Sequence, residues 1–312
     1  MSRFFEFLQK IEEPPAATTR DSEKILKNGG HTRDAKQILS VLHRPQVSAD
    51  SPSIEPSPEL GSVLVEEVQV APATRLFVHT DPTGLAADRF RLLRMRLSAL
   101  RSTGKLKSIL VTSPLPGDGK STVVLNLATA LAEGGNRKVL LIDADLHHAS
   151  LNHQLGIKAP TGLMECLKDG LNPLSVIKRI EPLKWYLLPA GGATANPTEL
   201  LQTESVSGVL QKLSPHFDWI IIDSPPVIPL TDAVSLTRHT DATLLVARAG
   251  RTPDTAIESA ISLLDSKHVI GIVLNGVDGL DRAYSRYKYS GYYGVNSSNP
   301  VKPPVDSLTE AQ

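Results

Sequence analysis

The chain has 312 residues, and 33 Lys and Arg residues balance 33 Asp and Glu residues, so its formal net charge is zero. A chain of this length can bury a substantial core in one large or two small domains, and zero net charge gives no overall attraction to nucleic acid or to an anionic membrane. Cys166 is the single cysteine, which excludes an intrachain disulfide and disfavours Cys-rich zinc and iron–sulfur sites.

No segment has the roughly 18 consecutive apolar residues of a membrane-spanning helix, and the N-terminus lacks the apolar core and cleavage site of a secretory signal. We therefore expect a cytoplasmic protein that does not have nucleic acid as a partner.

Prolines punctuate the polar sequence of residues 1–74, which predicts a largely disordered N-terminal region. Within it, the apolar residues from Phe4 to Ile11 could form a short amphipathic helix that docks on a partner or a membrane surface. A tail with transient helicity is the simpler interpretation.

From Leu76 onward, apolar runs alternate with segments of helical periodicity. This alternation predicts an α/β fold with a mostly parallel central sheet and helices on both faces. Near-continuous apolar runs predict the central strands at 109–111, 139–142, 219–222, 244–247 and 272–274.

Helix boundaries are indicated by capping residues. Asp81 and Pro82 favour a helix start, and this helix is expected to run to about residue 100. Its core stripe is predicted to be Phe90, Leu93, Leu97 and Leu100. Gly134 and Gly135 end a second predicted helix, and Pro197 begins another.

The segment Ser113–Thr122 reads SPLPGDGKST and lies between an apolar strand and a helical pattern. This context predicts a phosphate-binding loop, in which Lys120 reaches the β- and γ-phosphates and the Ser121 hydroxyl is placed for Mg²⁺. One departure is Pro114, where the common pattern has Gly. The residues expected to contact the nucleotide are Pro116, Gly117, Asp118, Gly119, Lys120, Ser121, Thr122 and, at the end of the last strand, Asn275.

Three acids follow two of the apolar strands. Asp143 and Asp145 end the run over 139–142, and Asp223 ends the run over 219–222. Carboxyl ends of strands are where open α/β sheets bind ligands, and Mg²⁺ requires oxygen ligands. The residues expected at the metal are Ser121, Asp143, Asp145 and Asp223. One or two carboxylates with the nucleotide phosphates suffice for Mg²⁺, so the three acids leave at least one for proton transfer.

The sequence over 76–293 resembles the cytoplasmic type of bacterial tyrosine kinases of capsule and exopolysaccharide synthesis. The resemblance rests on the phosphate-binding loop, on LLIDADL over 140–146, on FDWIIIDSPPV over 217–227, and on LPAG and NPTELL over 188–191 and 196–201. It implies a P-loop NTPase fold that uses ATP and Mg²⁺. It also implies that Lys120 neutralises phosphates, that Ser121 and Asp223 hold Mg²⁺, and that Asp143 and Asp145 supply metal organisation and the base.

The chain departs from the family pattern after its Asp pair. The family has Arg-Arg-Pro there, whereas this chain has His147, His148 and Ala149. The histidines could be a pH-sensitive or metal-binding substitute, but solvated surface residues are the simpler hypothesis.

Five of the six tyrosines lie close together near the C-terminus. They are Tyr284, Tyr287, Tyr289, Tyr292 and Tyr293. The resemblance implies that this cluster is the autophosphorylation substrate. Two alternatives are a low-complexity end and a stacking platform for single-stranded nucleic acid, aided by Arg282, Arg286 and Lys288.

Asp88, Arg91 and Arg94 are spaced three apart and therefore share one arc of their helix. The family has Glu-x-x-Arg-x-x-Arg there, which implies a subunit interface that builds a ring. An ordinary solvated helix face with an intrahelical ion pair is the alternative.

We therefore predict three regions: a largely disordered region over 1–74, a P-loop tyrosine kinase domain over 75–280, and a flexible tail over 281–312. The expected activity is autophosphorylation in trans, with a transmembrane co-polymerase as activator that recruits the chain to the inner face of the membrane, and with a cognate tyrosine phosphatase. An alternative is a positioning or assembly ATPase of the MinD/ParA kind. The loop of those proteins carries an additional signature lysine at the position where this chain has Pro116, which opposes this alternative. A nucleotide-binding module without activity is a further alternative, which the intact Lys120 and acids oppose.

Overall fold

A computed structural model describes residues 60, 63–104 and 106–277, and the unit that ends at Asn275 carries the sheet. Its eight strands are arranged in the order β1-β4-β5-β3-β6-β2-β7-β8. Neighbouring strands are parallel except for the β4–β5 pair. The strands are β1 (Leu64–Glu67), β2 (Ser108–Thr112), β3 (Val139–Asp143), β4 (Lys178–Glu181), β5 (Trp185–Leu188), β6 (Trp219–Asp223), β7 (Ala242–Arg248) and β8 (Val269–Asn275).

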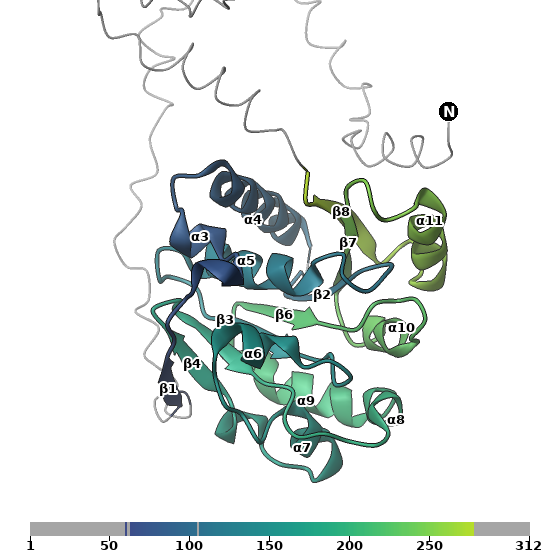
Figure 1. The fold of residues 1–312 in the computed structure, drawn as a ribbon. Coiled ribbons are helices and arrows are strands. Elements are labelled where there is room, and N and C mark those ends of the chain that lie inside the picture. Colours follow the sequence, from purple (N-terminus) through teal and green to yellow (C-terminus); the bar gives the residue numbers. More distant parts are fainter. Residues whose placement is uncertain (1–59, 61–62, 105, 278–312) are drawn as a thin grey trace, which may run out of the picture. The chain divides into compact units, whose positions relative to one another are not determined.

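Helices cover both faces of this sheet, with α4 and α5 on one side and α7 to α9 on the other (Figure 1). The α-helices are α3 (Phe77–Thr80), α4 (Leu85–Thr103), α5 (Lys120–Ala132), α6 (Ser150–Leu155), α7 (Leu163–Lys168), α8 (Pro197–Leu201), α9 (Ser205–Leu213), α10 (Asp232–Thr237) and α11 (Asp254–Leu263). Short 3-10 helices lie at Pro72–Thr74, Pro173–Ser175 and Ser214–His216. The predicted α/β fold with a mostly parallel sheet is confirmed.

All five predicted strands are present, and four of them, β2, β3, β6 and β7, are apolar because their side chains are buried on both faces of the sheet. The fifth, over 272–274, lies in β8, which ends the strand order beside β7 and leaves Leu274 exposed, so its prediction as a central strand was wrong. In β2, Ile109 and Val111 pack into the core on the α4–α5 side, whereas Leu110 packs into the core on the opposite side. Alternate residues of a strand point to opposite faces, so a strand buried on both faces must be apolar throughout. β3 and β6 follow the same alternation.

The α5 helix explains how the site is held. It begins at Lys120, directly after the phosphate-binding loop, and almost all of its residues are buried. A helix that is apolar on every side must lie inside a domain. The loop is therefore fixed between a central strand and a central helix.

Several boundaries differ from the sequence predictions. The sheet includes β1, which lies upstream of the boundary expected at residue 75, because Leu64 to Glu67 pair with β4. The start of the predicted helix was wrong: Asp81 ends α3, and α4 begins after Gly84, because a turn from Asp81 to Gly84 separates the two helices. Leu100 is exposed, so it does not belong to the core stripe that was predicted for this helix. Phe90, Leu93 and Leu97 do contact the core.

None of the described helices is long and apolar enough to cross a membrane. The predicted N-terminal helix, residues 1–59 and the tyrosine cluster over 284–293 lie outside the described residues.

Candidate functional site

The phosphate-binding loop connects β2 to α5 at the carboxyl edge of the sheet. Gly117 and Gly119 adopt φ angles of 82° and 92°, in the region where residues with a Cβ are strained. A Cβ on Gly119 would lie 2.0 Å from Nδ2 of Asn275. Glycine is therefore required at this position both by backbone conformation and by the close approach of the last strand.

Asp118 stabilises the loop from inside. Its carboxylate accepts hydrogen bonds from the Leu115 N–H at 3.0 Å and from the Thr252 hydroxyl at 2.7 Å. Asn275 donates from Nδ2 to the Asp118 carbonyl at 2.9 Å. The buried Asp118 side chain thus braces the loop, and Thr252 is a partner that the sequence analysis missed.

Lys120 lies between two of the predicted acids. Its Nζ is 2.7 Å from Oδ2 of Asp145 and 3.8 Å from Oδ1 of Asp223. Asp143 and Asp223 are register partners on the adjacent strands β3 and β6. Asp143 accepts hydrogen bonds from the N–H groups of Asp145 and Leu151, at 3.3 and 3.4 Å. The structure therefore brings together the lysine and all three acids.

Burial perturbs the ionisation of this cluster. Burial, and then repulsion by Asp223 and Asp145, raise the pKa of Asp143 well above its usual range. Burial also raises the pKa of Asp223 to about 6, although Lys120 opposes this effect. Burial alone would lower the pKa of Lys120, but the attraction of Asp223 and then Asp145 outweighs it, so the pKa of Lys120 is raised.

Asp223 has free oxygen atoms that fit a divalent cation. Both carboxylate oxygens of Asp223 are buried and accept no hydrogen bond within the described part of the chain, an arrangement that is costly unless a ligand completes it. Three buried carboxylates also face a single ammonium group. Among the described residues, no three His, Cys, Asp or Glu side chains form a group that could hold a metal ion, so Ser121, phosphate and water would complete the shell.

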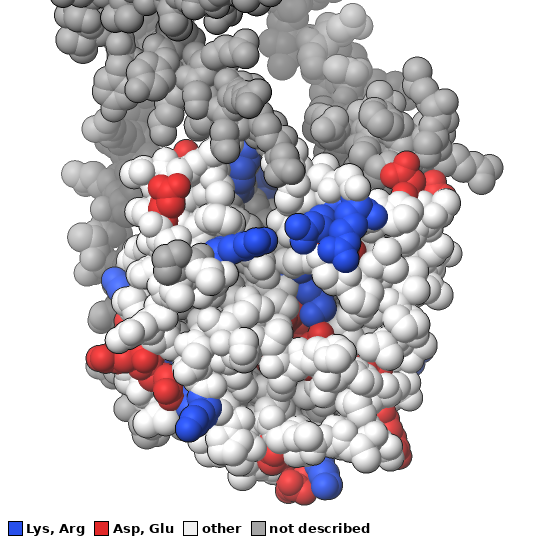
Figure 2. Space-filling model, viewed as in Figure 1, with Lys and Arg blue, Asp and Glu red and all other residues white. Residues whose placement is uncertain are grey.

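A cavity of about 490 Å³ opens beside the loop. Its lining includes six of the predicted site residues from the loop, namely Pro116, Gly117, Gly119, Lys120, Ser121 and Thr122. Asp145, His147 and His148 line it as well, whereas Asp143 and Asp223 do not. Figure 2 shows basic and acidic side chains together in a hollow of this face.

His147 is not the solvated residue that the simpler hypothesis expected. Its Nε2 lies 2.7 Å from Oδ2 of Asp232, whose side chain is fully buried. Asp232 was not predicted as a site residue, because the sequence gives no signal for a pair this far apart. His148 is exposed at the cavity rim.

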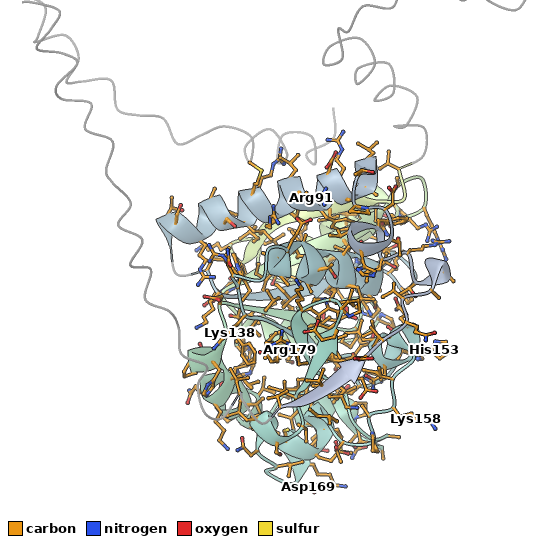
Figure 3. The ribbon with its side chains drawn as sticks, turned by 90° about the vertical axis from the view of Figure 1, so that its left-hand side faces the viewer. Arg91, Lys138, His153, Lys158, Asp169 and Arg179 are labelled. Carbon is orange, nitrogen blue, oxygen red and sulfur yellow. The ribbon has the colours of Figure 1, made fainter. Side chains whose placement is uncertain are left out.

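The predicted interface residues form ion pairs within the chain. Arg91, labelled on α4 in Figure 3, donates from Nη2 to Oε1 of Glu133 at 2.6 Å and from Nη1 to Oδ1 of Asp88 at 3.1 Å. Arg94 donates from Nη1 to Oε2 of Glu133 at 2.8 Å. Glu133 follows α5, so these contacts join α4 to α5. A role in subunit contacts stays a prediction.

Comparisons with known proteins agree with this geometry. A family model described as an AAA domain matches residues 106–258. Tyrosine-protein kinase YwqD of Bacillus subtilis is 28% identical over 222 residues, which cover 70% of this chain and 91% of YwqD. The succinoglycan biosynthesis transport protein ExoP of Rhizobium meliloti is 30% identical over 231 residues, which cover 69% of this chain and 29% of ExoP.

Among solved structures, the BceF tyrosine kinase domain is similar with a TM-score of 0.60 at 30% identity. The similarity covers 69% of this chain and 92% of the BceF domain. The chain therefore spans nearly all of YwqD and of this domain but less than a third of ExoP.

Proposed function

The chain belongs to the bacterial tyrosine kinase family, and we propose that it transfers the γ-phosphoryl group of ATP to the tyrosines over 284–293 of a second copy of itself. The observation that supports this most directly is the position of Lys120, which lies 2.7 Å from Asp145 at the end of the phosphate-binding loop. Phosphoryl transfer depends mainly on positioning and charge neutralisation, and a buried lysine at this point of the loop supports the second of these.

The charged side chains have distinct roles in this proposal. The ammonium group of Lys120 stays protonated because the acids around it raise its pKa, so it can neutralise phosphate oxygens. Ser121 and Asp223 would hold Mg²⁺, with Asp143 and Asp145 organising its surroundings. Mg²⁺, when bound, would neutralise charge on the phosphates.

Asp145 is better placed than Asp143 to receive the phenol proton. Asp145 lines the cavity, whereas Asp143 does not. Both carboxylates accept backbone hydrogen bonds, Asp143 from Asp145 and Leu151, and Asp145 from His148. A phenol has a pKa of about 10 and is protonated at neutral pH, so its attack on phosphorus needs a nearby carboxylate. We assign Asp145 as the base and Asp143 as the residue that positions it.

The nucleotide site is proposed to use the loop backbone from Pro116 to Thr122 and the side chain of Asn275. The positive φ angles of Gly117 and Gly119 allow consecutive N–H groups to face an anion. Asn275 contacts the loop at Asp118 and would lie beside the bound nucleotide.

The printed name of one relative supports a proposal for the biological setting. ExoP is named as a succinoglycan biosynthesis transport protein, so we propose that this chain regulates capsule or exopolysaccharide synthesis and export. A transmembrane co-polymerase would recruit it to the inner face of the membrane and activate it. A ring of copies and a cognate tyrosine phosphatase complete the proposal, whereas nucleic acid has no role in it.

The test uses the full chain, purified and dephosphorylated, then incubated with ATP and Mg²⁺. Peptide mass spectrometry should locate new phosphate on tyrosines between 284 and 293, and Lys120→Ala should carry none. Phosphate on Tyr186, or on serine and threonine, would contradict the proposed acceptor. Tyr186 is a useful internal control because it is buried in the core.

A further inference from the structure

Part of the lining of the cavity beside Lys120 differs in chemistry from the phosphate-binding loop. Pro226, Pro229 and Leu230 line it from the connection between β6 and α10, and His147 lines it from the connection between β3 and α6. Lys120 and Asp145 line the same cavity. A ligand in this space would therefore meet apolar groups along its sides and charged groups at its reacting end.

The apolar wall is fixed by backbone hydrogen bonds to the start of the loop. The Val227 N–H donates to the Ser113 carbonyl at 2.8 Å, and the Ile228 N–H donates to the Pro114 carbonyl at 3.1 Å. The Thr112 hydroxyl donates to the Pro225 carbonyl at 2.8 Å. Because the wall is held before any ligand arrives, little ordering would be required on binding.

His147 is held by a hydrogen bond to the start of α10. Its Nε2 lies 2.7 Å from Oδ2 of Asp232. An ionised carboxylate can only accept a hydrogen bond, so Nε2 is the donor whenever Asp232 is ionised. Asp232 is fully buried, and its second oxygen has no hydrogen-bond partner among the described residues. The imidazole is thereby oriented, and within the described chain no hydrogen bond occupies its Nδ1 atom.

Resting on the proposed function, we propose that the part of the cavity lined by Pro226, Pro229, Leu230 and His147 is the acceptor site for the tyrosine ring. Pro226, Pro229 and Leu230 would pack against the ring, and Nδ1 of the neutral His147 imidazole would accept a hydrogen bond from the phenol hydroxyl. His147 would thus align the hydroxyl oxygen toward the phosphate beside Lys120.

The chemistry of the acceptor segment matches this space. Residues 278–312 contain five tyrosines and neither Phe nor Trp, and tyrosine combines an apolar ring with a polar tip. A serine hydroxyl lies one carbon from the backbone, so serine could react only if the backbone itself entered between the walls. The site would therefore select tyrosine by its length as well as by its ring.

The experiment measures initial rates against acceptor concentration at saturating ATP and Mg²⁺. The acceptor is the full-length Lys120→Ala chain labelled with ¹⁵N, so that its phosphopeptides differ in mass from those of the enzyme. The enzymes are wild type, His147→Gln and Leu230→Ala. His153→Gln is the matched control, because His153 is exposed on α6 and lies outside the cavity lining (Figure 3). ADP affinity is measured separately for each enzyme.

We expect the KM for acceptor to rise about five- to tenfold in His147→Gln, as the loss of one hydrogen bond predicts. Leu230→Ala should raise it by about the same factor through lost apolar contact. ADP affinity should be unchanged in both, and His153→Gln should match wild type. If His147→Gln does not fold, Leu230→Ala still tests the inference. Leu230→Ala leaves the hydrogen bond between His147 and Asp232 in place.

An unchanged acceptor KM in both variants would overturn the inference. If ADP affinity fell by the same factor as the acceptor KM rose, the inference would also be overturned, because His147 and Leu230 would then belong to the nucleotide site. If the wild-type chain produced no phosphotyrosine, the proposed function would fail and this inference with it.

Discussion

Gly119 shows how closely the last strand approaches the phosphate-binding loop. It has a φ angle of 92°, and an added Cβ would lie 2.0 Å from Asn275. Gly119→Ala should therefore displace Asn275, strain the backbone by about 1–3 kcal/mol and abolish ADP binding in a calorimetric titration.

Gly134→Ala is the matched control for this change. Gly134 has a φ angle of 90°, but no heavy atom lies within 4 Å of the position that a Cβ would take there. This variant should lose stability from backbone strain alone and should bind ADP normally. Equal ADP affinities in the two variants would contradict the inferred role of the Gly119–Asn275 approach.

Asp223 illustrates a conflict between stability and function at a single residue. Burial raises its pKa to about 6, so the folded chain holds the ionised form at an energetic cost. Between the usual carboxyl pKa and pH 6 the native state binds more protons, and stability falls as pH rises through this range.

Asp223→Asn should remove that cost and the negative charge that a divalent ion requires. We expect equal or higher thermal stability without Mg²⁺, and a Mg²⁺ requirement for phosphotransfer raised by about tenfold or more. Asp254→Asn, on the exposed start of α11, is the control. If the phosphotransfer activity of Asp223→Asn depended on Mg²⁺ concentration in the same way as that of the wild type, Asp223 would not bind the metal.

At the scale of elements, the contact between α4 and α5 depends on a small ion-pair cluster. Glu133 accepts hydrogen bonds from Arg91 and Arg94, and these bonds, with Arg91 contributing most, lower the pKa of Glu133. A lowered folded pKa means that the carboxylate stabilises the fold above its ordinary pKa. The contribution is lost as pH falls through the lower folded value.

Glu133→Gln should therefore destabilise the chain at pH 7, and the difference from wild type should shrink toward pH 3. Because the cluster is partly exposed, we expect a difference of about 1 kcal/mol or less, measured by urea unfolding at each pH. Glu258→Gln, at an exposed position of α11, should show no such dependence. A pH-independent difference would assign the effect of Glu133 to packing.

Elements could be predicted from the sequence where burial on both faces imposed continuous apolar residues, as in β3 and β6. β1 and β4 were missed because their sequences, LVEE and KRIE, contain charged residues and only Ile180 is fully buried. β5 was also missed, because its apolar run WYLL is only four residues long and gives a weak strand signal. The start of α4 was misplaced because Asp81 and Pro82 fit a helix start as well as the turn in which they lie.

Some of the site residues could be predicted from the sequence and others could not. Lys120 and the acids could be found because motif spacing encodes them locally. Asp232, Thr252 and Glu133 could not, because each acts through a partner far away in the sequence that only the folded sheet brings close. Long-range pairing leaves no periodic pattern in one sequence.

For the whole molecule, the question is whether Arg91 and Arg94 also serve contacts between copies. A tail can enter a neighbour's site readily when assembly raises its effective concentration. Replacing both arginines with Ala should disperse oligomers in sedimentation and slow phosphorylation at low protein concentration, with recovery as concentration rises.

Glu133→Gln separates the two roles of the arginines, since it removes their partner within the chain and keeps both guanidinium groups. It should preserve assembly. If it disperses oligomers as fully as the double arginine variant, the arginines act through the α4–α5 contact and not through a subunit interface.

The most direct measurement is phosphate transfer between distinguishable copies of the full chain. Unlabelled wild type is mixed with ¹⁵N-labelled Lys120→Ala, ATP and Mg²⁺, and the phosphopeptides are resolved by mass. Phosphotyrosine should appear on heavy peptides from 284–293, at a rate that rises with protein concentration. Phosphate confined to light peptides, at a rate independent of concentration, would contradict autophosphorylation in trans.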